Sequence, residues 1–139
     1  MALHTEQITR KKPGDGLRIS VMSRHTLSDG ITPDSAITED LFDKWWPELA
    51  PPDDLIRWYY GEKKRKVLSQ EEIWSIFEPE FNLHLQSSAA EPRLHYLAAL
   101  ARNGVTTILC IEPTPEYCHR RLIAEACRRI NPTLTIIIE

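Results

Sequence analysis

The chain of 139 residues is 42% hydrophobic and 27% charged, with a formal net charge of −3, which excludes intrinsic disorder and argues against a protein that coats nucleic acid non-specifically. It has no run of the roughly 20 apolar residues that span a membrane and no secretory signal, so no membrane partner is expected. Its three cysteines are too few for a disulfide scaffold and predict reduced thiols in a cytoplasmic protein.

The N-terminal part predicts two strands and a long loop. Within residues 1–12 we expect an edge strand or a loose basic arm, followed by a turn at 13–16 that contains Pro and Gly. Apolar and polar residues alternate over 17–23, which predicts a strand with one buried face. The segment 23–38 predicts a long loop directly after this strand, and long loops in small domains often carry function.

The middle of the chain predicts helices. Apolar and aromatic residues fall at helical spacing over 38–47, and a short helical turn is expected over 53–61. A Ser followed three residues later by Glu forms a capping box, so a helix should begin at Gln70, with a kink or break at Pro79. A further amphipathic helix is expected over 92–103.

The C-terminal third has the clearest pattern. A nearly continuous β-branched run over 105–111 predicts a buried parallel strand, a helix is expected over 115–130, and 134–138 predicts a second buried strand. Together these elements form a βαβ unit. With strands near 5–11 and 17–23, the sequence predicts a single α/β domain in which helices flank a small, mostly parallel sheet.

The rim where strand 105–111 meets helix 115–130 is the predicted site, because ligands of open α/β sheets bind beyond the carboxyl ends of the strands. Cys118 and His119 fall in the first helical turn, with His119 on the apolar face that must pack on the sheet. His119 should therefore point inward, close to the end of the strand and its Cys110 and Glu112.

The function of the thiol leaves two interpretations open. A thiol in a first helical turn beside His119 and Arg120 should have a lowered pKa, so Cys118 is a candidate thiolate nucleophile. Alternatively, Cys118 packs as a small apolar side chain and His119 is a hydrogen-bonded core histidine. Cys127 lies in the apolar stripe of the helix and is expected to be a core residue.

Two classes of function follow. In the first, the rim is an enzyme site in which Arg24 and Arg120 hold a small anionic ligand, His119 acts as acid or base and Cys118 as thiolate. In the second, the same arginines serve a non-catalytic module that binds nucleotide or nucleic acid. The basic run 62–66 is expected to be a solvated face. The candidate catalytic residues are Cys118, His119 and Glu112, and the candidate ligand-binding residues are Arg24, His25, Arg120 and Cys110.

No cofactor or metal is expected. The sequence has no Gly-rich phosphate loop, no serine-hydrolase elbow and no zinc-protease motif. A structural zinc site needs four ligands, whereas Cys110, Cys118 and His119 supply three and Cys127 is turned away. A fourth ligand would have to be a carboxylate such as Glu112.

The segment from Leu109 to Leu122, with its Cys-x-Glu and Cys-His-Arg elements, resembles the hallmark of the DUF488 family, which includes the YeaO-like proteins. Residues 15–21, 46–51 and 55–61 are similar to further family segments in the same order, so the resemblance covers roughly residues 15–130. Family members often carry Asn-His where this chain has Cys118-His119. The resemblance implies the fold and the position of the site but no particular reaction.

Overall fold

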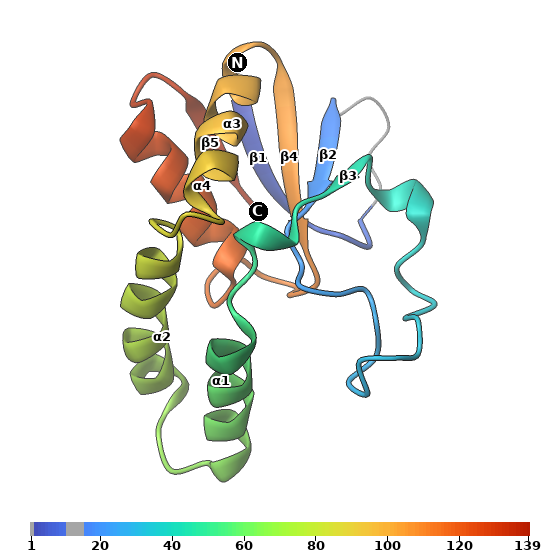
Figure 1. Ribbon diagram of the computed structural model, residues 1–139, viewed down its shortest axis with the longest axis vertical. Coiled ribbons are helices and arrows are strands. Elements are labelled where there is room, and N and C mark those ends of the chain that lie inside the picture. Colours follow the sequence, from blue (N-terminus) through green and yellow to red (C-terminus); the bar gives the residue numbers. More distant parts are fainter. Residues whose placement is uncertain (1, 11–15) are drawn as a thin grey trace.

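A parallel sheet in the order β3-β2-β4-β1-β5 is the framework of the fold (Figure 1). The computed structural model describes residues 2–10 and 16–139. The predicted α/β class is confirmed, and the sheet is wholly parallel over the described residues. Its strands are β1 (Ala2–Gln7), β2 (Leu17–Ser20), β3 (Lys44–Trp45), β4 (Val105–Cys110) and β5 (Thr135–Ile138).

The helices fall into two groups. The helices α3 (Glu91–Arg102) and α4 (His119–Ile130) pack against the sheet, whereas α1 (Asp53–Arg65) and α2 (Gln70–His84) form a pair that extends beyond the carboxyl ends of the strands (Figure 1). None of the helices in the described part of the chain has the length and apolar character that a membrane crossing requires.

The first strand is an interior strand of the sheet. The prediction of an edge strand or loose arm within residues 1–12 is wrong for the described part, because β1 pairs with β4 on one side and β5 on the other. Polar residues hid this strand in the sequence: buried Glu6 forms an ion pair with Arg18 at 3.2 Å. Residues 11–12 and most of the predicted turn at 13–16 lie outside the described residues.

The predicted helix over 38–47 is wrong. The segment contains a short 3₁₀ turn (Glu39–Leu41) and then an extended stretch that pairs with β2 as β3. The carboxylate of Asp43 accepts the main-chain N–H of Arg18, and the Trp45 indole donates to the Met22 carbonyl at 2.6 Å. Pairing with a neighbouring strand thus overrides the helical spacing of the aromatic residues.

The helix pair α1–α2 is longer than expected. Gly61 does not end α1, which continues to Arg65 and is capped by Lys66 in the left-handed conformation at φ 57°. The capping box predicted for α2 is present, because Ser69 accepts the N–H of Glu72 and the Glu72 carboxylate accepts the N–H of Ser69. Pro79 lies inside α2 without splitting it.

The two faces of the sheet are covered differently. On the helical face, Leu3, Ile19 and Ile108 pack into the main core with residues of α2, α3 and α4. On the opposite face, the smaller cluster around Ile8 and Leu109 is covered by the segment after β2, including Leu41 and Phe42. The long loop therefore covers the sheet and also reaches the carboxyl end of β2.

Candidate active site

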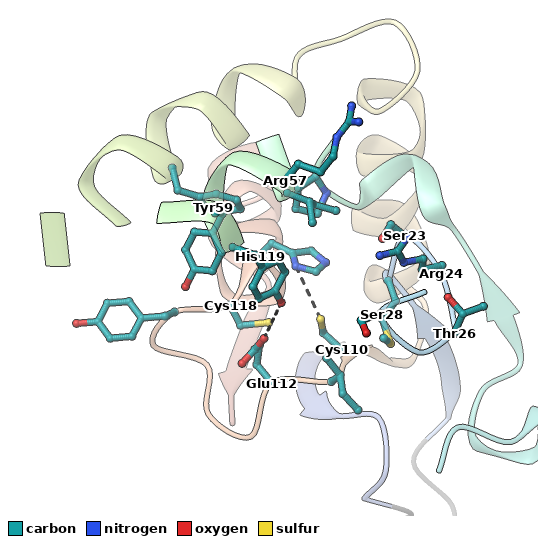
Figure 2. Close-up of a pocket in the computed structure, with 18 of the residues that line it drawn as sticks. Ser23, Arg24, Thr26, Ser28, Arg57, Tyr59, Cys110, Glu112, Cys118 and His119 are labelled. Carbon is teal, nitrogen blue, oxygen red and sulfur yellow. Dashed lines mark hydrogen bonds between the residues drawn. The ribbon is translucent and has the colours of Figure 1, made fainter. Parts of the chain in front are cut away.

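A cavity of about 620 Å³ lies at the carboxyl ends of β2 and β4. The two strands are parallel neighbours, so the predicted side-by-side position of their ends is confirmed. The loop after β2, the segment after β4, and residues of α1 and α2 line the cavity. The cavity brings together five of the predicted site residues: Arg24, Cys110, Glu112, Cys118 and His119 (Figure 2).

Cys110 is the last residue of β4 and is almost fully buried. Its sulfur accepts hydrogen bonds from the thiol of Cys118 and from the main-chain N–H groups of Glu112 and Ile111. These bonds, led by that from Cys118 and assisted by the charge of Arg120, outweigh burial and hold the pKa of Cys110 below its ordinary value. Cys110 is therefore the residue at this rim that favours the thiolate.

Cys118 is the N-cap of α4, which begins at His119 instead of near Pro115 as predicted. Burial raises the pKa of Cys118 well above its ordinary value, and its hydrogen bond to Cys110 and the charge there act in the same direction. The predicted lowered pKa of Cys118 is thus wrong, because its proton serves as a donor to Cys110. Of these two neighbouring thiols, Cys110 is the one that loses its proton more readily, and Cys118 keeps its proton.

His119 connects the strand ends through its two ring nitrogens. Nε2 lies 2.8 Å from the carbonyl oxygen of Val21, and since a carbonyl only accepts, Nε2 carries a proton. Nδ1 faces the Cys110 sulfur at 3.8 Å (Figure 2). His119 is half-buried, with the edge of Phe81 packed against it. The geometry leaves Nδ1 as the atom that can take a proton from Cys110 and return it.

Arg120 lies outside the cavity lining and is fully buried. Its Nη1 donates to the Glu112 carbonyl at 2.7 Å and to the Cys118 sulfur at 3.3 Å, while Nε and Nη2 donate to the Glu139 carbonyl. These bonds tie the segment after β4 to the start of α4 and the end of β5. The structure therefore places Arg120, predicted as a ligand-binding residue, in a positioning role.

Arg24 and His25 are adjacent in the chain but lie in different environments. Arg24 lines the cavity with an exposed side chain. His25 is outside the lining: its Nε2 lies 2.7 Å from the Ser20 hydroxyl, and its ring packs between Phe42 and Trp45. Burial lowers the pKa of His25. The structure thus places Arg24 at the cavity and His25 outside its lining, against Phe42 and Trp45.

Glu112 is half-buried, and its carboxylate accepts the hydroxyl of Tyr60 at 3.3 Å. Burial, followed by the charge of Glu112, raises the pKa of Tyr60, so its hydroxyl remains a donor. The sequence did not predict that residues of α1 would line the cavity. The signal was present, because Arg57, Tyr60 and Lys64 recur at the spacing of one helical face and all line the cavity.

Three possible ligand atoms of Cys110, Cys118 and His119 lie within 4.8 Å of one another. Thiolate and imidazole donors at this separation suit one soft ion such as zinc, with a fourth position open. A closed structural zinc site has four protein ligands, one more than this group offers. The absence of a metal stays a prediction.

The sequence is similar to that of a known protein family. Residues 3–130 match the family model described as "Active DUF488-N3 subclade". No curated protein and no solved structure is significantly similar to the chain. The match covers most of the sequence, including both strand ends and the Cys-x-Glu and Cys-His-Arg elements. The chain therefore belongs to the DUF488 family.

Proposed function

We propose that the protein is an enzyme that transfers a group from a small anionic substrate through a thiolate nucleophile at Cys110. One observation carries the proposal: the Cys110 sulfur lines the cavity 3.8 Å from Nδ1 of His119, in surroundings that hold the pKa of Cys110 below its ordinary value. A thiolate held by several donors is the nucleophilic form of cysteine. The family description "active" supports turnover.

The other residues take roles that follow from their positions. His119 Nδ1, 3.8 Å from the sulfur, accepts the proton of Cys110 when the thiolate forms. The thiolate then attacks an electrophilic atom of the substrate. As the new bond to sulfur forms, the bond to the leaving group breaks, and the departing group takes both electrons and the proton from His119. The oxygen of water or of a second substrate's hydroxyl then bonds to the transferred group while His119 Nδ1 takes its proton, and the electrons of the broken bond return to the Cys110 sulfur as thiolate.

Cys118, Arg120 and Arg24 support these steps without forming bonds to the transferred group. Cys118 supplies the hydrogen bond that stabilises the Cys110 thiolate, and buried Arg120 fixes the position of Cys118. The exposed guanidinium of Arg24 is placed to hold an anionic part of the substrate. This assignment moves the nucleophile from Cys118 to Cys110 and keeps the predicted roles of His119 and Arg24.

The test compares alkylation of the three cysteines by iodoacetamide, followed by peptide mass spectrometry across a pH series. At neutral pH we expect Cys110 to react on the order of tenfold faster than a free thiol. In Cys110→Ser this rapid phase disappears, whereas Cys127→Ser, the matched control, retains it. A rapid phase that survives in Cys110→Ser, or that maps to Cys118, would overturn the proposal.

Two further measurements distinguish the free thiolate from a bound metal and from a binding module. Alkylation repeated with a strong chelator should be unchanged, and faster labelling after chelation would mean that a bound metal, not a free thiolate, is the functional state. A non-catalytic nucleotide-binding module is the second candidate, favoured by the cationic residues around the cavity. Slow labelling of Cys110 together with nucleotide binding would select that module over the enzyme.

A further inference from the structure

The cavity has a cationic rim, by which we mean Arg24, Arg57 and Lys64. All three side chains are exposed, and in the described part of the chain no carboxylate lies within salt-bridge distance of any of them. Glu112 is the single acidic residue among the lining residues. A chain of net charge −3 thus gathers three cations at this cavity, of which Arg24 also interacts electrostatically with Asp29. Arginine forks and a lysine favour a phosphate group.

The cavity also has an aromatic wall, by which we mean Tyr59, Tyr60, Trp74, Phe77 and Tyr117. The rings brace one another: Trp74 stacks on Phe77 at 4.9 Å, and Tyr117 meets Trp74 edge-on at 5.7 Å. Tyr60 remains 46% exposed, so part of its surface is available to a ligand. A rigid wall of this composition suits a flat ring system.

The carboxylate of Glu112 indicates which kind of flat ring system the cavity would accept. Its carboxylate lies in the cavity lining beside the hydroxyl of Tyr60. A carboxylate accepts hydrogen bonds and repels anions, so the ring near it should carry N–H donors. The ring nitrogens and exocyclic amines of a nucleobase provide such donors, whereas a plain hydrocarbon ring does not.

Cationic residues lie on both sides of the reactive sulfur: Arg24 comes from the loop after β2, whereas Arg57 and Lys64 belong to α1, which also carries two tyrosines of the aromatic wall. Figure 2 shows Arg24 on one side of the Cys110–His119 pair and Tyr59 on the other. The volume of about 620 Å³ is within the range of small-molecule sites. We infer that the cavity binds a nucleoside monophosphate unit, with the base on the aromatic wall and the phosphate at Arg24, the member of the cationic rim on the opposite side. This inference rests on the proposed function only in placing the reacting bond near Cys110.

The experiment measures binding of adenosine 5′-monophosphate, adenosine and ribose 5-phosphate by calorimetry. It uses Cys110→Ser alongside the native chain, so that binding is recorded without reaction. We expect the monophosphate to bind about tenfold or more tightly than either fragment, since it engages both features. Arg24→Ala should weaken the monophosphate several-fold and leave adenosine unchanged. Arg128→Ala, an exposed arginine of α4, is the matched control and should change neither.

The outcomes separate the source of the nucleotide and the two proposals. If a 5′-phosphorylated oligoadenylate binds more tightly than the monophosphate, the bound unit belongs to a nucleic-acid strand. If the oligoadenylate binds equally or more weakly, the ligand is a free nucleotide. Absence of binding, or equal binding of ribose 5-phosphate and the monophosphate, would overturn the inference. Failure of the proposed function appears separately, as slow alkylation of Cys110 in a chain that still binds the monophosphate.

Discussion

The strand-end rim and the hydrophobic core each contain a buried cysteine, and the pKa values of the two thiols are shifted in opposite directions. Cys110 at the rim and Cys127 in the core are both almost inaccessible to solvent. Three donors converge on Cys110 and lower its pKa, whereas burial raises the pKa of Cys127 to about 12. Burial alone therefore does not determine thiol chemistry in this protein. The hydrogen-bond donors that the rim supplies make the difference.

Removing Arg120 should have the largest effect on stability, because its guanidinium joins the rim to β5. In Arg120→Met we expect the free energy of unfolding to fall by about 3 kcal/mol, since a fully buried guanidinium and its bonds to the partly buried carbonyls of Glu112 and Glu139 are lost. Urea unfolding measures this, with Arg128→Met as an exposed control expected to change by under about 0.5 kcal/mol. A loss below about 1 kcal/mol for Arg120→Met would contradict the positioning role.

The next effect concerns the hydrogen bond between the two rim thiols. In Cys118→Ala the Cys110 thiolate loses a donor worth about 1.5–3 kcal/mol, so the pH midpoint of Cys110 alkylation should rise by about one to two units. Cys118→Ser keeps a donor and should shift the midpoint less. If both variants leave the midpoint unchanged, the main-chain N–H groups alone determine the low pKa.

The strands that could be predicted from the sequence are those with regular patterns of apolar residues. Strands over 17–23, 105–111 and 134–138 have the periodicity or β-branched content of buried strands, and their order placed the rim at the end of β4. The strand near 5–11 was predicted only as an edge strand or a loose arm, because Thr5 and Glu6 of β1 are buried with polar partners distant in sequence. No local pattern reports such partners.

The site itself was predictable in position but not in electrostatics. The sequence put Cys110, Cys118 and His119 at one rim, and the cavity contains all three. It could not show that α4 begins after the turn ending at Cys118, where the N–H of Cys118 bonds to the Pro115 carbonyl. That short shift turns Cys118 from a first-turn residue into an N-cap. Two of the donors to Cys110 are backbone groups, which residue types do not reveal.

The core cysteine offers a pH test with the opposite sign. Since the folded pKa of Cys127 is about 12 and its unfolded pKa is about 8.5, its contribution to stability is complete below the lower value and is lost as pH rises toward the higher. Above about pH 9 this costs roughly 1.4 kcal/mol per pH unit. Unfolding measured at several alkaline pH values should therefore fall more gently in Cys127→Ala than in the native chain. Parallel slopes would mean that Cys127 is not shielded.

The smallest effect tests whether the helix pair and the rim are independent. Ser69→Ala removes the capping bond at the start of α2 and should lower the free energy of unfolding by about 1 kcal/mol. Ser88→Ala, an exposed serine just after α2, is the control and should change it by under about 0.5 kcal/mol. Because the donors to Cys110 come from the segment after β4 and from Cys118, its alkylation midpoint should stay where it is in both variants. A shifted midpoint in Ser69→Ala would show that α2, which contributes Trp74 and Phe77 to the cavity, also adjusts the thiolate. The groups that determine the pKa of Cys110 would then include residues of α2 as well as the hydrogen-bond donors at the rim.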